Sequence, residues 1–136
     1  SSHNARWRSV MTQPGTTQLT RMLSGPSSRA STRVKPSIEE GQRLYQFIGC
    51  MGCHSVDGSV AGRLGPSWKG LFGSTRELSD ESKVLADEAY LHESIIDPSK
   101  KKAKAYLKLE TGMPIYAGIL NEGQISSIIL YIKSLK

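Results

Sequence analysis

The chain has only two cysteines among its 136 residues, and both lie in the stretch CMGCH. A structural zinc site needs four ligands, so this cysteine content and the two distant histidines disfavour zinc. A thioredoxin-like dithiol should follow a strand, whereas the residues before Cys50 have a helical pattern. A short disulfide between the two cysteines is a further candidate. Cys50, Cys53 and His54 together match the Cys-x-x-Cys-His motif, in which two thiols attach one haem and the histidine binds its iron.

Long apolar runs are also missing, and no stretch of about 18 apolar residues could form a membrane-spanning helix. The length predicts a single domain. The hydrophobic fraction of 38% is modest, so a bound porphyrin would add to a rather small core.

Acidic residues are absent from residues 1–36, which hold six basic residues, whereas residues 37–136 hold twelve of each sign. All of the net charge of +6 therefore lies in a segment rich in Ser, Thr, Gly and Pro. This composition predicts a basic N-terminal extension or linker over 1–36 and a folded domain over 37–136. The extension either wraps the domain, tethers it to a membrane, docks on an acidic partner, or is a solvated tail. Its basic residues are scattered singly, which argues against nucleic acid as a partner.

A first helix is predicted from Ser37, where Ser37 and Glu40 match a capping box, and it should end at Cys50. Gly41 lies inside this helix, although glycine costs about 1 kcal/mol relative to alanine there. Close approach of another helix would explain the glycine.

A last helix is predicted after Asn121, with Gln124 at its third position completing the cap. Its apolar stripe consists of Ile125, Ile128, Ile129, Ile132 and Leu135, with Tyr131 beside it. We expect this helix to cross the first one at Gly41.

Between these helices, residues 76–78 and 83–85 predict a small two-stranded hairpin. Asp87 should cap a helix that continues through about Ile96, because Pro98 cannot extend it. A lysine run follows, made of Lys100, Lys101, Lys102, Lys104 and Lys108. It is either a solvated face or a basic patch that steers an acidic redox partner.

The order of these motifs resembles a class I cytochrome c. The similarity includes the CxxCH motif, then GRLGPSWKGLFG, LADEAYLHESIIDPSKK and GMPIYAGILNEGQISSIILYIKSL, and it covers residues 38–136. It is strongest to the cytochrome c domain fused to subunit II of haem-copper oxygen reductases, although no copper-binding domain precedes it here. The resemblance implies an all-α fold around one covalent haem c, with a possible small hairpin and an irregular N-terminal extension.

The resemblance also implies roles for residues outside the CxxCH motif. Pro66 would accept the Nδ1–H of His54 through its carbonyl, which fixes the imidazole and leaves Nε2 for iron. Trp68, Tyr116 and Arg63 are candidates for hydrogen bonds to the haem propionates, with packing as the alternative for each.

Several residues could supply the sixth iron ligand, and their positions in the sequence make some of them better candidates than others. Met51 is fixed between the two cysteines, and His92 falls inside a predicted helix. Met113 precedes a proline and follows Gly112, so an extended loop can carry its thioether onto a flat ring. The other candidates are lysines, which would have to lose a proton, and three residues of the extension, His3, Met11 and Met22. The resemblance also places the ligand at Met113.

The function implied is that of a one-electron carrier, not an enzyme, between a quinol-oxidising membrane complex and a terminal haem-copper oxygen reductase. A haem-bearing subunit of a larger oxidoreductase and a small-molecule-binding haem sensor are the alternatives. We expect a monomer in the periplasm or at the outer face of the cytoplasmic membrane, with the N-terminus as the site of any membrane or lipid anchor.

Overall fold

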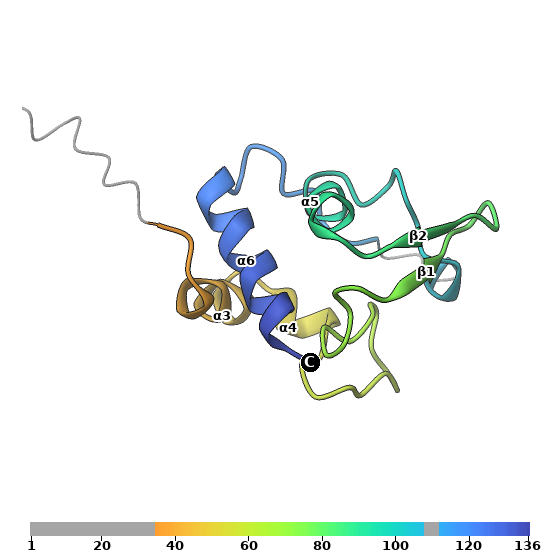
Figure 1. Ribbon diagram of the computed structural model, residues 1–136, viewed down its shortest axis with the longest axis horizontal. Helices are drawn as coiled ribbons and strands as arrows, with labels where there is room; N and C mark the ends of the chain where they lie inside the picture. The colour runs from red at the N-terminus through yellow and green to blue at the C-terminus, as the bar shows by residue number, and fades with distance from the viewer. Residues whose placement is uncertain (1–34, 108–111) are drawn as a thin grey trace, which may run out of the picture. The chain divides into compact units, whose positions relative to one another are not determined.

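The computed structural model describes residues 35–107 and 112–136. Within these ranges the helices are α3 (Ile38–Phe47), α4 (Cys50–Cys53), α5 (Glu88–Ile96), the short 3-10 helix η2 (Lys104–Tyr106) and α6 (Glu122–Ser134), and the strands are β1 (Thr75–Glu77) and β2 (Lys83–Leu85). This part of the chain is mostly helical with a small antiparallel hairpin, as the sequence predicts (Figure 1). The predicted extension up to residue 34, with His3, Met11 and Met22, lies outside the described residues, and so does Lys108.

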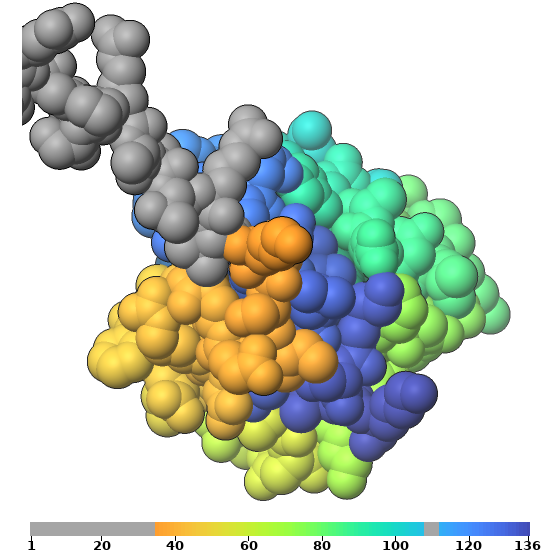
Figure 2. Space-filling view, turned by 60° about the vertical axis from the view of Figure 1, so that its left-hand side comes forward, coloured from red at the N-terminus to blue at the C-terminus, as the bar shows by residue number. Residues whose placement is uncertain are grey.

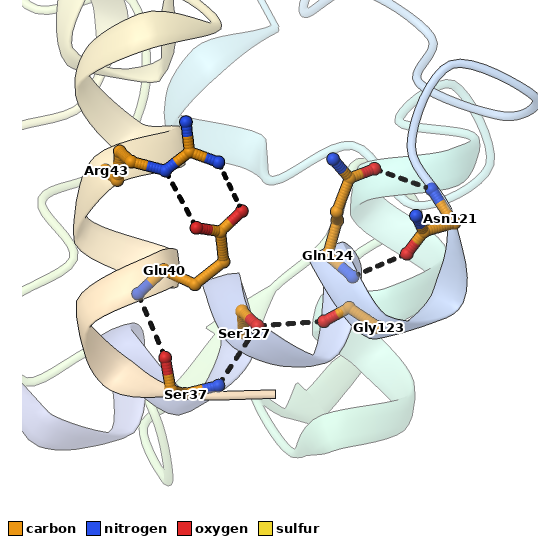
Figure 3. A network of polar contacts seen from close by, with 7 residues as sticks. All are labelled: Ser37, Glu40, Arg43, Asn121, Gly123, Gln124 and Ser127. Carbon is orange, nitrogen blue, oxygen red and sulfur yellow. Dashed lines mark hydrogen bonds and ion pairs between the residues drawn. The ribbon is translucent and has the colours of Figure 1, made fainter. Parts of the chain in front are cut away.

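The N-terminus of α3 shows half of the predicted capping box. The Ser37 hydroxyl accepts a hydrogen bond from the Glu40 backbone N–H at 3.1 Å, as expected. The Glu40 carboxylate does not return to Ser37 but binds the Arg43 guanidinium through two hydrogen bonds (Figure 3). The backbone N–H of Ser37 instead donates to the Ser127 hydroxyl of α6 at 3.2 Å, so this cap joins two helices.

The N-terminus of α6 has the complete capping box that Asn121 and Gln124 predict. The Asn121 side chain accepts from the Gln124 N–H at 2.9 Å, and the Gln124 side chain accepts from the Asn121 N–H at 3.0 Å (Figure 3). The predicted apolar stripe of this helix is buried, apart from half-buried Leu135, and Tyr131 is buried with it.

Helices α3 and α6 cross at Gly41, which confirms the predicted contact. The two helices lie against each other in both overall views (Figures 1 and 2). A Cβ at residue 41 would overlap the backbone carbonyl oxygen of Ser127 and would lie 2.7 Å from Cβ of Tyr131. Only glycine allows the backbones to approach this closely.

The prediction that the first helix ends at Cys50 is wrong. Helix α3 ends at Phe47, and Gly49 follows with φ of 95°, a left-handed conformation that favours glycine. Cys50 then begins the separate single-turn helix α4. The break changes the chain direction before the two cysteines.

The hairpin and α5 agree closely with the sequence prediction. Strand β1 pairs with β2 in a register that places Arg76 opposite Val84. The Asp87 carboxylate accepts from the Tyr90 N–H at 2.8 Å and caps α5, which ends at Ile96, two residues before Pro98.

The hydrophobic core joins α3, α5 and α6 with the segments between them. Trp68 and Leu71 contribute from the segment after α4, and Tyr116 and Leu120 contribute from the segment before α6. Across residues 35–107 and 112–136, the helices are too short or too polar to cross a bilayer.

Candidate functional site

A cavity of about 480 Å³ lies beside the CxxCH motif. Its walls come from the end of α4 and the residues after it, helix α5, residues 98–107, residues 112–115 and Ile132 of α6. The hydrophobic wall consists mainly of Leu64, Pro66, Trp68, Leu71, Leu91, Ile95, Leu107, Met113, Pro114, Ile115 and Ile132. Its volume lies in the range of small-molecule and cofactor sites, roughly 300–1,000 Å³.

The two cysteines lie at the start and end of α4 as free thiols. Three residues apart on one helical turn, they lie on the same side of the helix. Cys53 lines the cavity, and Cys50 is buried in the adjoining core. Burial raises the pKa of the Cys50 thiol to about 11, so this thiol stays protonated at neutral pH.

The His54 imidazole is oriented by the backbone of the segment that faces it. Its Nδ1 lies 2.8 Å from the carbonyl oxygen of Pro66, which confirms the predicted contact. A carbonyl can only accept, so Nδ1 carries the proton and Nε2 keeps its lone pair. Burial lowers the pKa of His54, although the Pro66 carbonyl acts in the opposite direction. The imidazole is therefore neutral, which is the state that binds a metal.

Gly65 provides the space in which this imidazole lies. A Cβ at residue 65 would overlap Cε1 of His54 and would lie 2.7 Å from its Nδ1. The Gly65 N–H also donates to the Cys53 carbonyl at 3.0 Å, which ties the Gly-Pro segment to α4. The Gly-Pro pair is thus part of the histidine site and more than a turn.

Aromatic rings support His54 from the side of the core. Trp68 is buried, and its ring centroid lies 5.6 Å from that of His54. Tyr45 packs against Trp68 at 4.9 Å, and its hydroxyl donates to the backbone carbonyl of His54 at 2.7 Å. The sequence alone does not identify Tyr45 as part of the site, because nothing local connects it to His54.

Met113 is half-buried and lines the same cavity as His54. The segment that carries it is tied to α5 through the Tyr116 N–H, which donates to the Ile95 carbonyl at 3.3 Å. Cys53, His54, Pro66, Trp68 and Met113 are thus the predicted site residues that line the cavity, with Cys50 next to it.

The other two predicted residues have their own partners and are not among the residues that line the cavity. The Arg63 guanidinium donates to the Met51 carbonyl at 3.1 Å. The Tyr116 hydroxyl donates to the Ile48 carbonyl at 3.0 Å, and burial raises its pKa. Their roles toward haem propionates stay predictions.

The lysine run is largely paired with carboxylates. Lys101 binds Glu93 at 2.7 Å, a hydrogen bond that raises the Lys101 pKa, and Lys100 lies 3.9 Å from the same residue. Lys104 contacts Glu77 at 3.0 Å. Lys102 lines the cavity and forms no ion pair with the described residues.

Residues 38–136 match the family model for cytochrome c, so the chain belongs to the cytochrome c family. A search of curated proteins finds no significant match. Members of the family bind a covalent c-type haem and transfer electrons with redox protein partners, and the Cys50 and Cys53 pair is consistent with that attachment.

The residues present fit this cofactor. Free thiols adjoin a hydrophobic cavity, a neutral imidazole lines it with one nitrogen uncommitted, and glycine clears the space around the ring. When bound, the haem supplies an iron centre that accepts and releases one electron. The chain contributes orientation of His54 through Pro66 and exclusion of water by the hydrophobic walls.

Proposed function

We propose that this cytochrome c is a one-electron carrier of a respiratory chain whose iron is bound by His54 and Met113. The observation that carries the proposal is that both residues line one cavity while the Pro66 carbonyl occupies the Nδ1–H of His54. Nε2 of the imidazole and the thioether sulfur are then two uncharged donors that line that cavity.

Two other candidates for the sixth ligand have different surroundings. Met51 is 49% exposed and lies on α4 between the cysteines. His92 is on α5, where its Nε2 lies 2.9 Å from a Glu122 carboxylate oxygen. Neither is among the residues that line the cavity.

A histidine and methionine pair suits a carrier that delivers electrons to an oxidase. Thioether ligation favours the ferrous state and raises the reduction potential relative to two histidines. With His54 and Met113 both bound to it, the iron would have no open site for a substrate. The protein then controls potential through ligands, burial and hydrogen bonds, and performs no bond chemistry.

We propose a haem-copper oxygen reductase as the electron acceptor and a quinol-oxidising membrane complex as the donor. The support is the similarity of residues 38–136 to the cytochrome c domain fused to subunit II of such reductases. We place the protein in the periplasm or at the outer face of the cytoplasmic membrane, with the basic N-terminal segment as the candidate anchor.

The mouth of the cavity is the proposed place of contact with these partners. Leu64, Leu107 and Ile115 line the cavity and are 42%, 43% and 56% exposed. Exposed Lys102 lines the same cavity. A partner that covers this mouth would bring its own redox centre close to the haem without opening the fold.

The ligand assignment is tested by ferric absorption spectra of Met113→Ala and of Met51→Ala as the matched control. We expect the weak charge-transfer band at the red end, which marks sulfur ligation, to vanish in Met113→Ala and to persist in Met51→Ala. Ferrous Met113→Ala should also bind carbon monoxide, whereas the wild-type protein should not. A band that survives in Met113→Ala, or carbon monoxide binding by the wild type, would contradict the proposal and favour a sensor.

A further inference from the structure

Arg76 lies on the inner face of the hairpin. Its neighbours in β1, Thr75 and Glu77, are exposed, whereas Arg76 is half-buried. Side chains alternate between the two faces of a strand, and directly paired residues share a face. The partner of Arg76 is Val84, which packs against the hydrophobic core. The guanidinium therefore lies on the side of the hairpin that faces the interior.

The Arg76 side chain has a buried nitrogen without a partner. Its Nε is buried and forms no hydrogen bond, the one side-chain nitrogen or oxygen of this kind among the described residues. The other half-buried cations in residues 35–107 and 112–136 are satisfied, since Arg63 donates to a carbonyl and Lys133 binds Glu88. Buried polar groups in native proteins are hydrogen-bonded, so the unpartnered Nε of Arg76 indicates a missing acceptor.

The surroundings of Arg76 connect it to the haem cavity. With Thr75, Glu77, Lys104 and Ala105 it lines a second hollow of about 350 Å³, and Ala103 lines both this hollow and the haem cavity. The same segment is held to the hairpin by a bridge between Leu78 and Ala103 and by the Ser79 N–H, which donates to the Lys102 carbonyl. Arg76 thus lies at the boundary between the hairpin and the cavity wall.

The other charges around this hollow are exposed or already paired. Lys104 contacts Glu77 at 3.0 Å and Glu81 at 3.8 Å, so these side chains offset one another. The remaining charged residues on the two segments are Lys83 and Lys102, both exposed cations, and Asp80, an exposed carboxylate that accepts from the backbone N–H and the hydroxyl of Ser82. Arg76 has no ion pair with any described carboxylate, so its charge is available to an anion that the described residues do not supply.

We infer that Arg76 binds a haem propionate. The haem that the family carries has two carboxylates, and a partly buried carboxylate needs charged donors. A guanidinium presents several N–H groups in a planar fork that matches a carboxylate. Arg63 and Tyr116, two of the residues that the sequence suggests for this role, donate to backbone carbonyls instead. The inference rests on the family's cofactor and not on the proposed ligands or partners.

The test is redox potentiometry of holoprotein from pH 5 to pH 9, comparing wild type, Arg76→Gln and Lys104→Gln. Loss of a positive charge beside the haem favours ferric iron. At alkaline pH, we therefore expect Arg76→Gln to lower the ferrous-to-ferric ratio about tenfold at a fixed solution potential. For one electron this corresponds to a fall of roughly 59 mV in the reduction potential. Without the guanidinium the propionate pKa rises, so the potential of Arg76→Gln should fall with pH across the neutral range. Lys104→Gln, which alters the same hollow, should keep the wild-type pH profile.

A wild-type potential and pH profile in Arg76→Gln would overturn the inference. If Arg76→Gln does not fold, the same measurement on Arg76→Lys tests the inference. Arg76→Lys keeps the positive charge but loses the planar fork of N–H donors. The haem propionate in this variant should therefore titrate at a higher pH than in wild type. An unchanged dependence of the potential on pH would contradict the inference. The ferric sulfur band of each variant is recorded in parallel. Loss of this band would count against the proposed sulfur ligand. That outcome is distinguishable from the result for Arg76, which is read from the potential and its pH dependence.

Discussion

Three neighbouring residues determine the position of His54 and which of its ring nitrogens carries the proton. The Pro66 carbonyl accepts its Nδ1–H, Gly65 leaves room for its ring, and the Tyr45 hydroxyl binds its backbone carbonyl. The first two come from one short segment, whereas Tyr45 comes from α3. The proposed iron ligand is thus connected directly to the helix pair that organises the domain.

Tyr45→Phe should lower the free energy of unfolding by about 1–2 kcal/mol, because the partly buried His54 carbonyl loses its donor while the ring is retained. The matched control is Tyr131→Phe, since Tyr131 is buried in the same aromatic group and its hydroxyl has no hydrogen bond with the described residues. Denaturant titration of the ferric holoproteins measures both. Equal stability losses would show that the hydroxyl of Tyr45 contributes nothing specific.

The sequence predicts those site residues that belong to a motif or lie close to one along the chain. Cys50, Cys53 and His54 are adjacent, and the Gly-Pro pair follows closely. Tyr45 and Arg76 could not be found in this way, because their importance arises from contacts that only the fold creates. Arg76 resembles any strand residue until its buried, unpartnered Nε is seen.

At the scale of elements, the crossing of α3 and α6 organises the domain. Gly41 permits the close contact, and the Ser37 N–H adds a hydrogen bond to the Ser127 hydroxyl of the facing helix (Figure 3). The Ser127 hydroxyl in turn donates to the Gly123 carbonyl at 2.9 Å. Polar groups at this interface are therefore satisfied where the helices are too close for larger side chains.

Gly41→Ala should destabilise the domain by roughly 1–3 kcal/mol, because the new methyl group overlaps the Ser127 backbone and forces the helices apart. This loss outweighs the gain in helix propensity of about 1 kcal/mol. Gly52→Ala is the matched control, since it also lies in a helix and a Cβ there meets nothing within 4 Å. Thermal unfolding followed by circular dichroism compares the two. A Gly41→Ala variant as stable as Gly52→Ala would contradict the assigned crossing.

Helix boundaries are predictable where one local interaction dominates. The predicted boundaries of α5, from Asp87 and Pro98, agree with the structure, and so does the start of α6 at the Asn121 capping box. The box at Ser37 is only half formed, because Arg43 on the next turn binds the Glu40 carboxylate. The break before Cys50 cannot be predicted in this way, because Gly49 could equally end a helix or continue it, and only the structure shows its left-handed φ of 95°.

At the scale of the whole molecule, the described domain balances its charges locally. Glu93 binds Lys100 and Lys101, and Glu77 and Glu81 contact Lys104. The lysine run therefore carries a weaker field than its sequence suggests. Lys102 stands out because it lines the cavity without an ion pair to any residue that the structure describes.

Lys102→Glu should slow electron transfer to a haem-copper oxygen reductase roughly two- to tenfold at low salt, because a charge at the contact surface changes the encounter rate. The difference should shrink at physiological ionic strength, where the Debye length is about 8 Å. Lys83→Glu is the control, with the same charge change on an exposed residue of β2 that is not among the residues lining the cavity. Stopped-flow oxidation measures the rates. Equal rates for the two variants would remove Lys102 from the docking surface.

The pairing of α3 with α6 also governs how the domain can fold. The hydrogen bond between Ser37 and Ser127 joins residues 90 positions apart, so the main partner of α3 arrives only after a very long loop has closed. Loop closure costs entropy before any contact repays it, and proteins with distant contacts fold more slowly than local helical bundles. We therefore expect the meeting of the first and last helices, and not the formation of either one, to limit the folding rate of this helical domain.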